Sequence, residues 1–124
     1  MKILIVDDHP GLREEIQGML TRRGHMADAV GSADDALPLL ATGDYDFLLV
    51  DFQMPVHDGL WLMKHRPRPT RTKALLITAH VDRSVINEMF NAGAVGYIIK
   101  PFGEEDLLRH LAFHSEHVVR APEG

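Results

Sequence analysis

The sequence predicts an α/β domain in which one parallel sheet is covered by helices on both faces. Short unbroken runs rich in Ile, Leu and Val are typical of strands that are buried on both sides. The chain contains four such runs, at residues 3–6, 47–50, 74–77 and 97–99, and segments with helical periodicity separate them. Right-handed crossovers between parallel strands then give a doubly wound, three-layer sandwich.

A first helix is expected directly after the first apolar run. Pro10 suits the first helical position, Ile16 and Leu20 recur at helical spacing, and Gly24 is placed to end the helix. Residues 25–30 form a shorter and less apolar run, which fits a strand at the edge of the sheet.

The second helix begins at a recognisable capping signal. Ser32, with Asp35 three residues later, resembles a capping box. Pro38 lies inside this helix and is expected to cost one backbone hydrogen bond or to cause a kink. A short third helix is expected from about residue 59 to 64, where a proline-containing stretch cuts it off.

The last two helices complete the alternation. The fourth is expected over residues 82–92, with Gly93 as a left-handed stop. The fifth is expected from about residue 104 to 119, with Phe113 pointing nearly away from the core. Three histidines share one face of this helix and are expected to form a solvated flank: His110, His114 and His117.

Composition restricts the class of protein. A chain of 124 residues with 45% apolar and 25% charged residues suits one globular domain. The net charge of −5 argues against direct binding of nucleic acid, and the basic stretch 64–73 is expected to be a solvated loop at the amino end of the sheet. There is no cysteine, no apolar run of membrane-spanning length and no signal peptide, so we expect a cytoplasmic protein without a membrane segment.

Polar residues that suit phosphate chemistry follow the apolar runs. Asp7 and Asp8 follow the first, Asp51 the second, Thr78 the third and Lys100 the last. Ligands of such sheets bind just beyond the carboxyl ends of the strands, so these groups are expected to converge. A carboxylate at a strand end is often only a turn former, but three clustered carboxylates need a cation. The pattern therefore predicts a site for Mg²⁺ and a phosphoryl group.

Asp51 is the expected nucleophile of this site. It stands alone at the end of a central run, and the loop after it, with Met54 and Pro55, can hold it open to a phosphoryl donor. A carboxylate that attacks a phosphoryl group needs positive charge on the transferring oxygens, which a divalent cation and Lys100 can supply. The hydroxyl of Thr78 can donate a hydrogen bond to a phosphoryl oxygen.

Together these residues resemble the receiver domain of bacterial response regulators, the phosphoacceptor module of two-component signalling. The resemblance covers nearly the whole chain, in order and at compatible spacings. It implies a flavodoxin-like (βα)5 fold with strand order 2-1-3-4-5, a receiver domain over residues 1–120 and a short tail or linker at 121–124. The motifs that carry it are Asp7-Asp8, Asp51 with Met54-Pro55 and Asp58-Gly59, Thr78-Ala79, Gly93-Ala94, Tyr97 and Lys100-Pro101-Phe102.

The resemblance also implies how the site would hold a metal ion. Asp51 is the phosphoacceptor, and Mg²⁺ or Mn²⁺ has Asp8 and Asp51 as direct ligands. The backbone carbonyl of Gln53 contributes, and Asp7 acts through water. Three histidines follow site residues and are expected on the rim as surface loop residues rather than as metal ligands: His9, His57 and His80.

A second set of residues is implied to sense the phosphoryl group. Thr78, Ala79 and Lys100 are implied to contact the phosphoryl group. Thr78 would shift toward this group, and Tyr97 would then turn inward. Pro101 is expected to follow a cis peptide bond. Gln53 and His80 are implied to border the path of the hydrolytic water and to modulate the lifetime of the phosphorylated state. Because neither residue is a carboxylate that could activate this water, slow self-dephosphorylation is expected.

Three functions remain compatible with the sequence. The first is a signalling switch, a phosphoacceptor rather than an enzyme, that is charged by a sensor histidine kinase or phosphotransfer protein. It would act on a protein target, or form a homodimer, through the face made by the fourth helix, fifth strand and fifth helix. The second is the regulatory domain of a truncated DNA-binding regulator with a fused effector, since Asp8-His9-Pro10 with Arg13 looks like the start of such receivers. The third, a Mg²⁺-dependent phosphatase, would need a second carboxylate where Gln53 stands.

Overall fold

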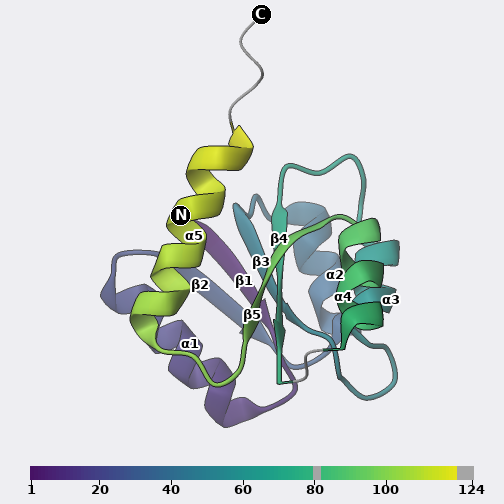
Figure 1. Cartoon of the computed structure of the whole chain (residues 1–124), viewed down its shortest axis with the longest axis horizontal. Coiled ribbons are helices and arrows are strands. Elements are labelled where there is room, and N and C mark those ends of the chain that lie inside the picture. Colours follow the sequence, from purple (N-terminus) through teal and green to yellow (C-terminus); the bar gives the residue numbers. More distant parts are fainter. Residues whose placement is uncertain (80–81, 120–124) are drawn as a thin grey trace, which may run out of the picture.

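Five strands and five helices alternate along the chain, as expected (Figure 1). The computed structural model describes residues 1–79 and 82–119, with the side chains of the last helix described as far as Ser115. The strands are β1 (Lys2–Val6), β2 (Met26–Val30), β3 (Phe47–Asp51), β4 (Lys73–Thr78) and β5 (Ala94–Ile99). The helices are α1 (Pro10–Arg22), α2 (Ala33–Thr42), α3 (Gly59–His65), α4 (Arg83–Asn91) and α5 (Glu104–Val119). His80 and the tail 121–124 lie outside the described residues.

The strands form one parallel sheet in the order β2-β1-β3-β4-β5. This order confirms the doubly wound, flavodoxin-like fold. Because β1 pairs with β2 on one side and β3 on the other, the chain winds in opposite directions from this point. The switch point of the sheet therefore lies between the ends of β1 and β3, where ligands of such folds bind.

Helices cover both faces of the sheet (Figure 1): α1 and α5 lie on one side, and α2, α3 and α4 on the other. Successive residues of a strand point to opposite faces. In β1, Ile3 and Ile5 pack in the cluster that includes α1 and α5, whereas Leu4 and Val6 pack with α2, α3 and α4. All four side chains are fully buried, which explains why this strand is apolar without interruption.

The helix ends follow the local sequence signals. The Ser32 side chain accepts a hydrogen bond from the Asp35 backbone N–H at 3.1 Å and caps α2. Pro38 lies inside α2, which continues past it. Gly24 and Gly93, at the ends of α1 and α4, have φ angles of 84° and 111°, a region that side chains with a Cβ rarely occupy.

The last helix corrects one expectation. His114, expected on a solvated flank, has only 8% of its surface exposed because it packs over Gly96 of β5. A Cβ added at Gly96 would lie 2.6 Å from the His114 Nε2, so the glycine makes room for the ring. Phe113 is 52% exposed, as expected, whereas the side chain of His117 lies outside the described part of the chain.

Among the prolines that the structure describes, two follow a cis peptide bond, Lys100–Pro101 and Arg68–Pro69. The first confirms the expectation for Pro101, and the second was not anticipated from the sequence. Within the described residues, none of the helices has both the length and the apolar character needed to cross a membrane.

Candidate functional site

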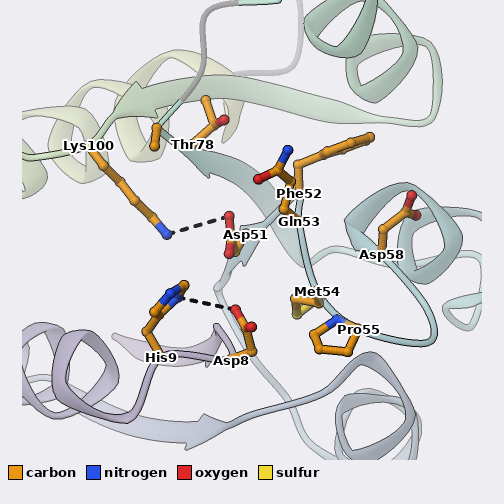
Figure 2. Close-up of a pocket in the computed structure, with 11 residues that line it drawn as sticks. Asp8, His9, Asp51, Phe52, Gln53, Met54, Pro55, Asp58, Thr78 and Lys100 are labelled. Atoms are coloured by element: carbon orange, nitrogen blue, oxygen red, sulfur yellow. Dashed lines mark ion pairs between the residues drawn. The ribbon is translucent and has the colours of Figure 1, made fainter.

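The predicted polar residues meet at one edge of the sheet. Asp51 and Thr78 end β3 and β4, and Asp8 and Lys100 come just after β1 and β5. They border a hollow of about 480 Å³ beyond the carboxyl ends of the strands (Figure 2). The residues that line it are Asp8, His9, Asp51, Phe52, Gln53, Met54, Pro55, Asp58, Thr78, Ala79 and Lys100.

Lys100 connects two carboxylates. Its Nζ donates a hydrogen bond to Asp7 Oδ2 at 2.8 Å and lies 3.5 Å from Asp51 Oδ1. The Lys100 side chain is only 15% exposed, and those of Asp7 and Asp51 are 0% and 7% exposed. Water therefore screens these charges weakly, so that the single ammonium attracts both carboxylates strongly.

Asp7 does not line the hollow, because it is held beneath it by hydrogen bonds. Its Oδ2 accepts from Lys100, and its Oδ1 accepts from the backbone N–H of His9 at 2.9 Å. Its own carbonyl accepts from Arg13 Nη1 at 2.8 Å. With both carboxylate oxygens engaged, Asp7 serves to position the ammonium and the turn that follows β1.

Asp51 is a buried carboxylate whose negative charge is only partly compensated by Lys100. Burial raises the pKa of its carboxyl above the ordinary value, Lys100 lowers it, and the charges of Asp7 and Asp8 raise it further. The net direction is upward. An added positive charge at this position would therefore favour the ionised form, which is the form that can act as a nucleophile.

Asp8 provides an oxygen that lacks a partner. Its Oδ1 is buried and makes no hydrogen bond within the described structure. His9 Nδ1 lies 3.2 Å from this atom, as a charge contact rather than a hydrogen bond, and the His9 side chain is 70% exposed. A buried carboxylate oxygen without a donor is costly, and a cation would satisfy it.

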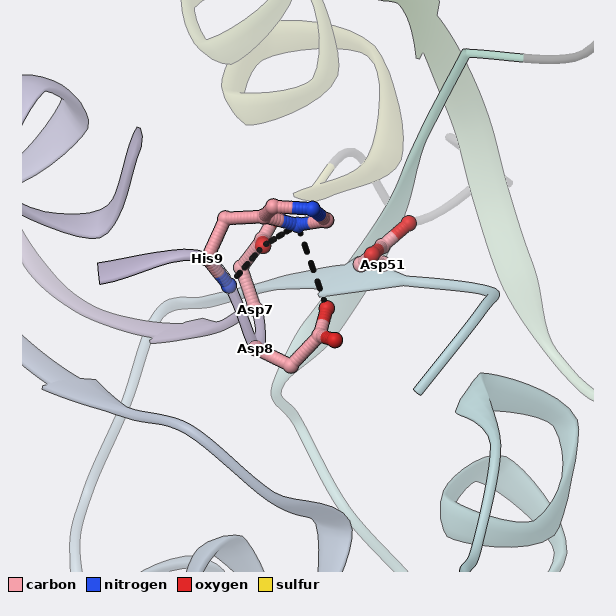
Figure 3. A group of neighbouring side chains, drawn as sticks. All are labelled: Asp7, Asp8, His9 and Asp51. Atoms are coloured by element: carbon pink, nitrogen blue, oxygen red, sulfur yellow. Dashed lines mark hydrogen bonds and ion pairs between the residues drawn. The ribbon is translucent and has the colours of Figure 1, made fainter. Parts of the chain in front are cut away.

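Asp7, Asp8, His9 and Asp51 form one compact group (Figure 3). Each offers one ligand atom, and these atoms all lie within 4.8 Å of one another. Three carboxylates, of which Asp8 has an unpartnered oxygen, fit a hard divalent cation, which prefers oxygen ligands. The residues present are thus suited to a metal such as Mg²⁺.

The loop after Asp51 is shaped by a close backbone approach. Gly59 donates its N–H to the Phe52 carbonyl at 2.8 Å, and a Cβ added at Gly59 would lie 2.6 Å from the Asp51 carbonyl oxygen. Asp58 accepts from the Trp61 N–H at 2.9 Å and caps α3. These contacts bring the start of α3 against the end of β3, leaving the Asp51 carboxylate to face the hollow.

The remaining predicted residues fall into two places. Thr78 is buried, whereas Gln53 and Ala79 are exposed at the rim of the hollow. Tyr97 does not reach this hollow: it is 37% exposed on β5 and meets the Phe90 ring edge to face at 6.4 Å. A second hollow of about 490 Å³ includes Tyr97, Pro101 and the buried His114.

Two residues that contact the aspartates had no predicted role in the site. Arg13 holds the Asp7 carbonyl, and His9 approaches both Asp7 and Asp8, with Nδ1 3.2 Å from an oxygen of each. His9 was expected only as a surface loop residue. The signal available was its position directly after the two aspartates, but the orientation of its ring depends on the turn into α1.

Comparison with known proteins places these features in context. A family model described as the response regulator receiver domain matches residues 3–112. The chemotaxis protein CheY-3 of Vibrio cholerae is 41% identical over 108 residues, which cover 82% of this chain and 82% of that protein. The response regulator protein FleR of Pseudomonas aeruginosa is 39% identical over 117 residues, which cover 92% of this chain and 24% of FleR.

A solved structure shares the fold and contains a metal. The receiver domain of the sensor histidine kinase PA1611 from Pseudomonas aeruginosa superposes with a TM-score of 0.80 at 27% identity, covering 90% of this chain and 94% of that one. In that structure a magnesium ion is coordinated in the active site cleft.

Proposed function

This chain belongs to the response regulator receiver family of two-component signalling, and we propose that it is a phosphorylation-dependent switch whose phosphoacceptor is Asp51. The observation that carries the proposal is the geometry around that carboxylate. Asp51 faces the hollow at the switch point of the sheet, 3.5 Å from the Lys100 ammonium and beside the unpartnered oxygen of Asp8. A carboxylate, a fixed positive charge and an oxygen suited to a cation thus lie together, which supports the proposal.

The chemistry is a transfer of a phosphoryl group between two side chains. An Asp51 oxygen attacks the phosphorus of a phosphohistidine on the donor, a P–O bond forms, the P–N bond breaks, and the released imidazole nitrogen takes a proton from solvent. Lys100 is poised to hold a phosphoryl oxygen, which neutralises charge on the transferring group. The product is an aspartyl phosphate.

A divalent cation, Mg²⁺ or Mn²⁺, would be held by Asp8 and Asp51, with the Gln53 carbonyl and, through water, Asp7. When bound, it would supply positive charge that offsets the negative charge of the carboxylates and of the phosphoryl group. The hydrogen bonds from Lys100 and His9 occupy both oxygens of Asp7, which supports a role for Asp7 through water rather than by direct contact.

Thr78, Ala79 and Tyr97 would convert this local event into a change of surface. The Thr78 hydroxyl moves toward the new phosphoryl group, and the outward-facing Tyr97 turns into the space that is vacated. The affected surface is the face formed by α4, β5 and α5, which serves a protein partner or a second copy of the chain. NMR shift mapping and sedimentation velocity with the phosphoryl mimic beryllofluoride would test this; perturbations that spare Tyr97 and α5 contradict it.

The partners follow from this chemistry. A sensor histidine kinase or a phosphotransfer protein would supply the phosphoryl group, and a target protein or fused effector would read it. We further propose that the receiver domain extends over residues 1–120 and that the protein is cytoplasmic. The protein would act as a phosphoacceptor that assists its own phosphorylation and dephosphorylation rather than as an enzyme with turnover on other substrates.

Intact-mass analysis tests the assignment of Asp51. Treatment with acetyl phosphate and Mg²⁺ is expected to add one phosphoryl group to the wild type and none to Asp51→Asn, because the amide is not nucleophilic. Asp35→Asn, an exposed aspartate on α2, is the matched control and should label like the wild type. Equal labelling of Asp51→Asn, or labelling that persists in EDTA, would defeat the proposal.

A fused output domain is the second candidate, and one observation favours it. The chain aligns with only 24% of FleR, so closely similar receivers occur within much longer regulators. The genomic reading frame around this segment separates the two: a continuing frame would reveal the effector, whereas a stop codon supports a stand-alone regulator. The phosphatase alternative is disfavoured because Gln53, not a carboxylate, stands two residues after Asp51.

A further inference from the structure

A third hollow lies at the opposite end of the sheet from Asp51. It measures about 520 Å³ and is bordered by Arg66, Thr70, Lys73 and Gly93, among others. It opens where β4 begins, and the six residues of β4 place it roughly 16 Å from the strand ends, at about 3.3 Å per residue. In Figure 1 the loop between α3 and β4 arches over the upper edge of the sheet, whereas the strands end at the lower edge.

Arg66 is a buried cation that has no carboxylate partner in the described part of the chain. It is 8% exposed, its Nη1 donates to the Thr72 carbonyl at 3.2 Å, and its Nε is buried without a hydrogen-bond partner. Burial lowers the pKa of Arg66, and the charge of Arg68 lowers it further. A guanidinium nevertheless stays charged at neutral pH, so this arrangement is costly unless an anion compensates it.

The neighbouring groups add positive charge to the hollow. Lys73 Nζ lies 5.8 Å from the centre of the Phe47 ring and makes no ion pair with any described carboxylate. Arg71 differs, because it is already paired with Asp44 and Asp46 at 2.8 Å each. The hollow therefore contains two cations, Arg66 and Lys73, that the described protein does not neutralise.

Two further features suit an anion. The Thr70 hydroxyl accepts a hydrogen bond from the Thr72 backbone N–H at 3.0 Å, which leaves its own proton available to donate. Gly93 lets the guanidinium lie close to the backbone at the border of the hollow, since an added Cβ would lie 3.1 Å from Arg66 Nη2. A hydroxyl, an ammonium and a guanidinium thus border one hollow.

We propose that this hollow is a binding site for a phosphate-type oxyanion, held by Arg66 with Lys73 and Thr70. The planar guanidinium matches the oxygens of a phosphate, and its charge is not compensated by any carboxylate of the described residues. The site is independent of the proposed phosphoacceptor function, because it lies at the other end of the sheet and requires neither Asp51 nor a divalent cation.

An NMR titration of the full chain tests the proposal. Inorganic phosphate and ADP are added separately, at constant ionic strength and without divalent cations, so that a free anion is distinguished from a nucleotide phosphate. Amide shifts are expected at Thr72, Gly93 and Val95. Affinity should fall at least tenfold, or about 1.4 kcal/mol, in Arg66→Met and severalfold in Lys73→Gln.

The control variant removes one positive charge, as Arg66→Met and Lys73→Gln do, but at a position outside the hollow. Lys64→Gln removes one exposed cation from α3, outside the hollow, and should bind phosphate like the wild type. If Arg66→Met does not fold, Lys73→Gln alone decides the outcome. Absence of saturable shifts with both anions, shifts confined to the Asp51 hollow, or equal loss of affinity in Lys64→Gln would overturn the proposal.

Discussion

Replacing Asp51 with Asn is expected to stabilise the metal-free protein at neutral pH. The Asp51 side chain is buried, and its ligand atom lies within 4.8 Å of those of Asp7 and Asp8. At an effective dielectric constant near 20, each neighbouring carboxylate repels a charge on Asp51 by at least ~3.5 kcal/mol, whereas Lys100 at 3.5 Å attracts it by ~5 kcal/mol. The net electrostatic energy disfavours the ionised Asp51 by ~2 kcal/mol, before the cost of its burial is added. The uncharged amide of Asn removes this destabilisation.

The effect is expected to depend on pH in a defined direction. Burial raises the pKa of Asp51 in the folded protein above the ordinary value of 3.8, Lys100 opposes the rise, and Asp7 adds to it. The destabilisation by the ionised carboxylate is therefore complete above the folded-state pKa. It is lost as the pH falls through that pKa toward 3.8, so the advantage of Asp51→Asn should shrink in acid.

Thermal unfolding in EDTA, followed by circular dichroism, measures this difference. For a chain of 124 residues, ~2 kcal/mol corresponds to a rise in Tm of roughly 6–10 °C. The control Asp35→Asn should change stability by less than about 0.5 kcal/mol. Added Mg²⁺ should narrow the gap, because a bound cation compensates the wild-type carboxylates. An Asp51→Asn variant that melts at or below the wild type in EDTA, or a gap that widens in acid, refutes the reasoning.

Three further changes probe the loop and the rim of the site. Gly59→Ala should lower the free energy of unfolding in urea by about 1–3 kcal/mol, because the added Cβ would lie 2.6 Å from the Asp51 carbonyl oxygen. The control Gly11→Ala, where an added Cβ meets no atom within 4 Å, should be neutral or stabilising. Equal losses in the two variants would contradict the steric explanation. Asp58→Ala should cost about 1 kcal/mol through the lost cap of α3, whereas Asp58→Asn should retain most of it, so similar losses in the two variants would argue against capping. Gln53→Ala should alter the half-life of the phosphorylated protein, measured by loss of the phosphoryl group over time, since Gln53 borders the hollow; an unchanged half-life would remove it from the path of the hydrolytic water.

His80 was expected to share this role of Gln53, and it lies outside the described residues. The expectation stays a prediction. His80→Ala, assayed in the same way as Gln53→Ala, is expected to change the hydrolysis rate. Gln53 and His80 each stand two residues after a residue of the proposed phosphoryl site, Asp51 and Thr78 respectively.

The element order and the end of the sheet that carries the site were predictable from the sequence. Strands buried on both faces must be apolar throughout, so residues 3–6 and 47–50 stand out, and helix signals such as Ser32 and Gly93 act within a few residues of the chain. In a parallel sheet the strand ends share one edge. The convergence of Asp51 and Lys100 therefore followed from the order of the strands.

Only the tertiary structure decided how individual side chains are used. The Lys100 ammonium bonds to Asp7, 93 residues away, and leaves one oxygen of Asp8 without a donor. His114 is buried because Gly96 on the neighbouring strand makes room for its ring. Arg66 is buried without a carboxylate partner among the described residues, although the basic stretch 64–73 was predicted to be a solvated loop. Periodicity reports which face of an element is apolar, but the pairing of polar groups depends on contacts between distant segments, which local sequence does not encode.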